Sequence, residues 1–135
     1  MSATLVDTNV LLDLATSDPA WADWSVRALD AAAMAGAVWI NGVVYAELSV
    51  RFASIEELDA FLAEAQIDLA PTPRPALFLA GKAFLQYRAA GGARTGVLPD
   101  FFIGAHAAVA DWALLTRDAA RYRTYFPTVR LVTPR

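Results

Sequence analysis

Short apolar runs alternate along this chain with longer segments in which apolar side chains recur at helical spacing. Five runs of four or five residues suit buried strands, and they lie at residues 3–7, 37–40, 67–70, 113–116 and 129–132. Helical patterns fill the stretches between them, at residues 9–15, 18–36, 42–53, 55–65, 75–92, 99–111 and 118–125. Strands that alternate with helices are typical of a parallel sheet covered on both faces. The pattern therefore predicts an α/β fold with a central parallel sheet of about five short strands.

Local signals predict where several helices begin. The dipeptide Asp18-Pro19 is a start signal for the helix at residues 18–36. Asn41 is placed to cap the next helix, and Ser54 with Glu57 has the spacing of a capping box.

Length and composition restrict the class of protein. The chain has 135 residues, of which 57% are hydrophobic and 19% charged, so we expect a single folded domain over residues 1–135. No apolar run approaches the ~18 residues of a membrane span, and the N-terminus has no signal-peptide pattern, so we expect a cytoplasmic protein without a membrane partner. Because there is no Cys and one His, His106, any bound metal must have oxygen ligands.

The charge is distributed unevenly, although the net charge is only −3. Residues 1–73 carry eleven acids and two bases, whereas residues 74–135 carry nine bases and three acids. Such asymmetry indicates a polyanion or an oppositely charged protein as partner. Ten of the eleven bases are Arg, which suits bidentate contacts with phosphate, although a solvated Arg-rich surface explains the same composition.

Acidic residues recur close to the carboxyl ends of the predicted strands. Asp7 closes the first strand, Asp118 follows the fourth by two residues, and Asp100 lies in the first turn of a helix. Ligands of parallel sheets bind at this edge. Each Asp taken alone is more simply explained as a helix cap or as an acid that complements the helix dipole.

Glu47 is harder to explain as a cap. It lies about two turns into its helix, at helical spacing from Val43 and Val50, so the sequence predicts that it faces an apolar surface. A buried carboxylate needs a partner, and Arg51, four residues on, is a possible one although it lies at an angle off that face. A divalent cation shared with the other acids would satisfy all of them, and Mg²⁺ or Mn²⁺ prefers such oxygen ligands.

Four segments together resemble the PIN-domain nucleases, and in particular the VapC-type toxins of toxin–antitoxin modules. They read LVDTNVLLDL, YAEL, LPDFFIGAHA and LLTRDAARY, and the resemblance extends from Leu5 to Val132. It implies a three-layer α/β/α domain with a catalytic acidic quartet, which in this chain is Asp7, Glu47, Asp100 and Asp118. The resemblance also implies supporting polar residues beside the acids, namely Thr8, Asn9 and Thr116.

The resemblance implies hydrolysis of RNA phosphodiester bonds with Mg²⁺ as cofactor, which Mn²⁺ could replace. Asp7, Asp100 and Asp118 are the expected metal ligands, and Glu47 either binds the metal or positions the attacking water. We expect RNA along the basic half, where the candidate phosphate contacts are Arg88, Arg94, Arg117 and Arg121. The implied protein partners are a cognate antitoxin and a second copy of the chain.

Other interpretations remain open from the sequence alone. A solitary PIN nuclease that processes RNA without an antitoxin fits the same motifs. A non-catalytic binding module of the same fold would need a broken quartet, and a phosphoacceptor receiver domain would need a Lys at a late strand, whereas the only Lys is Lys82. Gly104 either leaves space near the metal or serves packing, and we expect His106 to be structural.

Overall fold

The computed structural model describes residues 2–93 and 97–134. Its central sheet has five parallel strands in the order β3-β2-β1-β4-β5. The strands are β1 (Thr4–Val6), β2 (Val38–Asn41), β3 (Asp68–Ala70), β4 (Ala113–Leu115) and β5 (Leu131–Val132). The predicted parallel sheet of five short strands is confirmed.

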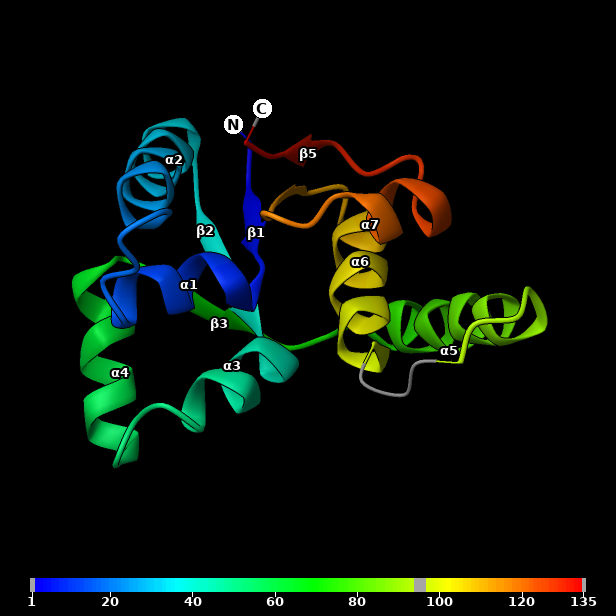
Figure 1. Ribbon diagram of the computed structural model, residues 1–135, viewed down its shortest axis with the longest axis horizontal. Coiled ribbons are helices and arrows are strands. Elements are labelled where there is room, and N and C mark those ends of the chain that lie inside the picture. Colours follow the sequence, from blue (N-terminus) through cyan, green and yellow to red (C-terminus); the bar gives the residue numbers. More distant parts are fainter. Residues whose placement is uncertain (1, 94–96, 135) are drawn as a thin grey trace.

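Helices lie on both sides of this sheet, as the alternating pattern predicted. They are α1 (Thr8–Ala15), α2 (Ala22–Ala35), α3 (Gly42–Ser49), α4 (Ile55–Glu64), α5 (Arg74–Ala89), α6 (Leu98–Ala110) and α7 (Ala120–Tyr125). Figure 1 shows α1, α2 and α4 to one side of β1, and α5, α6 and α7 to the other. Among the described residues, no helix is both long enough and apolar enough to cross a membrane.

The helices α2 and α3 differ most in length from the ranges that the sequence predicted. α2 begins at Ala22 because the Asp18 carboxylate accepts hydrogen bonds from the backbone N–H groups of Ala20 (2.8 Å) and Trp21 (3.0 Å), which holds the chain in a separate turn. α3 ends at Ser49 instead of continuing to residue 53. After α3 the chain turns toward the next helix, and the centre of the Phe52 ring lies 5.2 Å from that of the Phe61 ring on α4.

The predicted caps at Asn41 and Ser54 are present. The Asn41 side chain accepts a hydrogen bond from the Val44 N–H (3.1 Å), and the Ser54 hydroxyl accepts one from the Glu57 N–H (3.1 Å). The Glu57 carboxylate reaches back to the N–H of Ala53 (3.2 Å), one residue earlier than in the ideal capping box.

An aromatic cluster fixes the helix that carries Asp100. Phe101 is fully buried, and its ring lies 5.6 Å from that of Phe84 on α5 and 6.1 Å from that of Phe126. A Cβ atom added to Gly104 would lie 2.4 Å from the Phe126 ring. Gly104 therefore serves packing, and the alternative that it leaves space near a metal is wrong.

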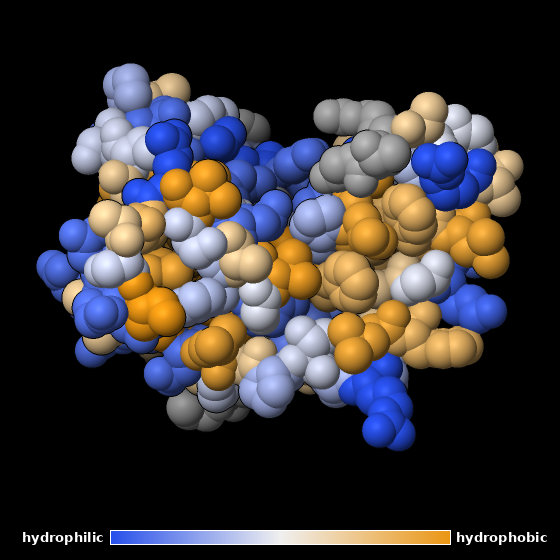
Figure 2. Space-filling view, turned by 90° about the horizontal axis from the view of Figure 1, so that it is seen from below, coloured by the Kyte–Doolittle hydropathy of each residue, from blue (hydrophilic) through white to orange (hydrophobic). Residues whose placement is uncertain are grey.

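Apolar side chains remain exposed on the outer surface of α5. Leu77, Phe78 and Leu85 are 46%, 69% and 61% exposed. Figure 2 shows apolar side chains gathered over this helix, on the right of the face seen from below. The core of the domain lies between the helices and the sheet, so these residues contribute little to it.

Candidate functional site

Asp7 is held by three side-chain donors at the end of β1. Its Oδ2 accepts hydrogen bonds from the Thr116 hydroxyl (2.7 Å), the Tyr122 hydroxyl (2.9 Å) and the Asn9 amide (3.4 Å). The residue is 5% exposed, and this burial raises the pKa of its carboxyl, which the hydrogen bonds from Thr116 and Tyr122 partly offset. The Asp7 carboxylate is thus buried and fixed in orientation.

Thr116 connects Asp7 to the loop that carries Asp118. Its buried hydroxyl donates to Asp7 and accepts a hydrogen bond from the Asp118 N–H (3.1 Å). Asn9 adds a second link, because its side-chain oxygen accepts a hydrogen bond from the Arg117 N–H (3.2 Å). These hydrogen bonds hold the end of β4 and the start of α1 together at the candidate site. Asp118 lies directly after Arg117, and it is exposed.

Asp100 is half-buried in the first turn of α6 and forms an ion pair. Arg121 Nη1 lies 2.6 Å from Asp100 Oδ2. The pKa of the Asp100 carboxyl is raised from 3.8 to about 6, chiefly by burial and then by the charge of Asp7. Arg121 opposes this rise, and Asp118 adds to it. Three acids from separate segments therefore act on one another electrostatically.

Glu47 differs from the sequence expectation. It is half-buried, and Val50, which was expected on the same apolar face, is the C-cap residue of α3 and is 83% exposed. The Thr8 hydroxyl donates a 2.6 Å hydrogen bond to Glu47 Oε1. The argument that a buried, unpaired Glu47 needs a shared cation is therefore wrong. Glu47 is nevertheless near the site, because after burial its charge also contributes to the raised pKa of Asp7.

The sequence did not identify Tyr122, which lies on the short helix α7. Its hydroxyl is 2.9 Å from Asp7, and burial together with the charge of Asp7 raises the pKa of this phenol well above its usual value. The available signal was its place as the last residue of the motif LLTRDAARY, but only the folded chain brings its hydroxyl to Asp7.

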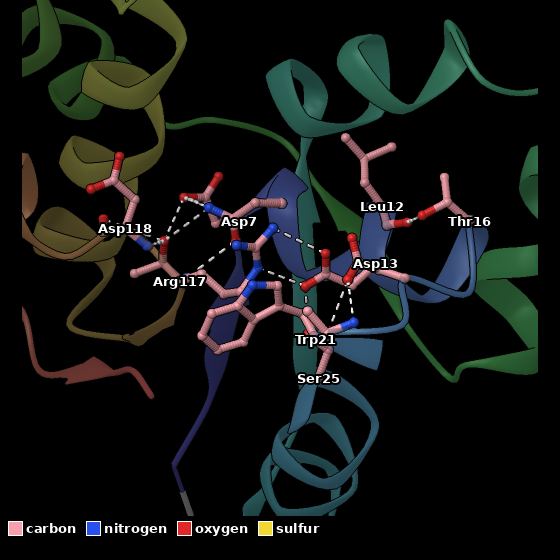
Figure 3. A network of polar contacts seen from close by, with 12 residues as sticks. Asp7, Leu12, Asp13, Thr16, Trp21, Ser25, Arg117 and Asp118 are labelled. Carbon is pink, nitrogen blue, oxygen red and sulfur yellow. Dashed lines mark hydrogen bonds and ion pairs between the residues drawn. The ribbon is translucent and has the colours of Figure 1, made fainter. Parts of the chain in front are cut away.

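A second acid, Asp13, was also missed, and it binds one of the candidate RNA contacts (Figure 3). Asp13 is 2% exposed, and its carboxylate accepts hydrogen bonds from Arg117 Nε (2.7 Å), Arg117 Nη2 (3.0 Å) and the Ser25 hydroxyl (2.9 Å). The Arg117 guanidinium also lies 4.9 Å from the centre of the Trp21 ring. The sequence did contain a signal for Asp13, because it is an acid within the otherwise apolar helical stretch at residues 9–15.

The other candidate RNA contacts lie in different surroundings. Arg88 is exposed on α5, Arg121 pairs with Asp100, and Arg94 lies outside the described residues.

His106 is buried with its Nδ1 3.2 Å from the Asn41 amide nitrogen, and burial lowers the pKa of its imidazole. The expectation that His106 is structural is confirmed.

Comparison with known proteins agrees with this arrangement. The sequence matches the family model of the PIN domain over residues 4–127. The chain belongs to the PIN-domain family. A comparison of this PIN domain with curated proteins gives no match.

Solved structures share the fold of this PIN domain at low sequence identity. VapBC2 from Rickettsia felis, bound to a DNA fragment from its promoter, gives a TM-score of 0.73 at 18% identity and covers 97% of this chain and 98% of its own. DNA-bound VapBC from Salmonella typhimurium gives 0.71 at 15% identity, with 98% of each chain covered. A toxin–antitoxin complex from Klebsiella pneumoniae gives 0.69 at 21% identity, again with 98% of each chain covered.

The donor set of this PIN domain suits a hard divalent cation in its chemistry. Carboxylate oxygens are the ligands that Mg²⁺ prefers, and burial and mutual repulsion make a shared cation favourable. One of these acids, Asp100, already forms an ion pair with the Arg121 guanidinium. With the side chains in this arrangement, no three acids or histidines among the described residues are placed to hold a metal ion.

Proposed function

We propose that this PIN domain is a Mg²⁺-dependent endoribonuclease, active also with Mn²⁺, and the cytoplasmic toxin of a VapBC-type module. The observation that carries the proposal is that Thr116 joins Asp7 at the end of β1 to the loop of Asp118, and that the charges of both acids act on Asp100 on α6. Membership of the PIN-domain family and the similarity to VapBC structures support the same function.

Asp7, Asp100 and Asp118 would hold the metal ion. When bound, Mg²⁺ lowers the pKa of a water molecule and stabilises negative charge on phosphate. The protein's own contribution is orientation: Thr116, Tyr122 and Asn9 hold the Asp7 carboxylate in one position.

The side chains around the acids complete the proposed site. Glu47, held by Thr8, is a further ligand or positions the attacking water. Arg88, Arg117 and Arg121, with Arg94, are the proposed contacts to RNA phosphates.

We also propose a cognate antitoxin and a homodimer as protein assemblies. The excess of acids in residues 1–73 suits an antitoxin that places a basic side chain near the acids. Co-expression with the product of the neighbouring small gene tests this: we expect growth arrest by the PIN domain, rescued by that product. Arrest that persists in Asp118→Asn would argue against nuclease toxicity, and the mass measured by light scattering tests the dimer.

Cleavage assays test the enzymatic proposal directly. We expect cleavage of single-stranded RNA with Mg²⁺ or Mn²⁺ and none with excess EDTA. Asp118→Asn should abolish cleavage, whereas the control Asp111→Asn, an exposed residue at the C-terminus of α6, should retain it. Undiminished cleavage in EDTA would contradict the proposal.

A further inference from the structure

Arg121 is placed unusually for a surface arginine. It lies at the start of α7, its side chain is only 17% exposed, and its Nη1 is 2.6 Å from Asp100 Oδ2. The guanidinium also lies 5.9 Å from the centre of the Tyr87 ring. The side chain thus extends into the group of acids instead of into solvent.

The ion pair with Arg121 offsets part of the repulsion within the acid group. Burial and the charges of Asp7 and Asp118 disfavour ionised Asp100, and Arg121 is the cation that favours it. A metal ion at Asp100 would do the same, but two cations at one carboxylate repel each other. Binding of either cation therefore weakens binding of the other.

The arrangement of the acids is consistent with this competition. While Arg121 contacts Asp100, no three acids within the described residues are positioned to hold a metal ion. Asp7 has its three donors and cannot turn without losing them. Asp100 has a flexible partner, because an arginine side chain can change rotamer without movement of its helix.

We propose that Arg121 is an internal cation that occupies Asp100 in the metal-free protein, has to leave it when the metal binds, and so sets the metal affinity. The inference rests on the proposed metal-dependent function. It makes Arg121 a determinant of metal affinity, distinct from a residue that only stabilises the fold.

Binding of Mn²⁺ to purified variants, measured by calorimetry, tests the competition. Arg121→Gln should bind Mn²⁺ roughly tenfold more tightly than the wild type, the size expected for losing one opposing charge-assisted hydrogen bond. Arg123→Gln is the matched control, because it removes the same charge from an exposed position on the same helix. It should change the affinity by less than about twofold. Equal affinities of the two variants, or weaker binding by Arg121→Gln than by the wild type, would overturn the proposal.

The same titrations separate this inference from the proposed function. If the wild type binds Mn²⁺ and Arg121→Gln binds it equally, only the inference fails. If neither protein binds Mn²⁺, the metal-dependent function fails as well.

Crystal structures of the wild type with and without Mn²⁺ provide a test that needs no variant. We expect the Arg121–Asp100 ion pair without metal, and Asp100 on the metal with the guanidinium beyond hydrogen-bond distance when Mn²⁺ is bound. A metal-bound structure with this ion pair intact would overturn the proposal even if Arg121→Gln does not fold.

Discussion

Replacement of Asp100 by Asn should stabilise the metal-free protein at neutral pH while abolishing cleavage. The pKa of Asp100 is raised from 3.8 to about 6. At neutral pH, ionisation of this group in the folded state therefore costs up to about 3 kcal/mol of unfolding free energy. The side chain is 29% exposed, and the substitution deprives Arg121 of its ion pair, so solvent screening and this loss should leave about 1 to 2 kcal/mol.

The sign of the effect depends on pH in a defined way. Below pH 3.8 the carboxyl is protonated in both folded and unfolded states, so Asp100 imposes no cost. The cost grows as the pH rises from 3.8 to about 6 and is constant above that. Asp100→Asn should therefore stabilise the protein at pH 7.5 and have little effect at pH 4.

Thermal melts followed by circular dichroism measure this effect. For 135 residues, 1 kcal/mol corresponds to about 3.5 °C in Tm, so Asp100→Asn should melt about 4 to 7 °C higher than the wild type in EDTA at pH 7.5. Mg²⁺ should raise the Tm of the wild type more than that of the variant, because a ligand stabilises only the state that binds it.

The competing explanation treats Asp100 only as an acid that complements a helix N-terminus. Asp23, exposed in the first turn of α2, provides the control, because Asp23→Asn should cost up to about 1 kcal/mol. The reasoning is refuted if Asp100→Asn also lowers the Tm in EDTA and Mg²⁺ stabilises it as much as the wild type.

Three further substitutions test other parts of the structure. Tyr122→Phe removes one hydrogen-bond donor to Asp7, so it should lower the unfolding free energy by about 1 to 2 kcal/mol and weaken Mn²⁺ binding measured by calorimetry. If both quantities are unchanged, Tyr122 does not orient Asp7. Gly104→Ala places a methyl group against the Phe126 ring and should cost about 1 to 3 kcal/mol in urea denaturation, unless that ring can move aside. Arg88→Gln should leave the Tm unchanged and reduce the slope of log K for RNA against log salt by roughly 0.7, and an unchanged slope would exclude this phosphate contact.

The fold and the position of the acids could be predicted because both follow from local patterns. Apolar runs identify the strands, and an acid that follows such a run lies at the carboxyl edge of a parallel sheet. Asp7 and the loop of Asp118 are therefore joined through the Thr116 hydroxyl, although more than a hundred residues separate the two acids. Asn41 and Ser54 cap their helices as predicted because capping depends on neighbouring residues alone.

The partners of the acids could not be predicted, because they come from distant parts of the chain. Arg117 follows the strand β4, whereas its partner Asp13 lies on α1, 104 positions earlier. The burial of Glu47 was misjudged because helical spacing shows which residues share a face but not whether another element covers that face, and Val50 at the C-cap of α3 is exposed. After α3 the chain packs against α4 through the rings of Phe52 and Phe61, a contact that sequence periodicity does not report.

The two acids most affected by burial are held in opposite ways, and this difference has a chemical consequence. Asp7 accepts hydrogen bonds from three neutral side chains, two of them buried, so its orientation is fixed with or without a cation. Asp100 is paired with one long, charged side chain, which has the same sign of charge as a metal ion. Neutral donors do not compete electrostatically with a cation, whereas a guanidinium does. If a metal ion binds as proposed, it should leave the hydrogen bonds of Asp7 in place and rearrange the surroundings of Asp100, so that the cost of releasing Arg121 becomes part of the free energy of metal binding.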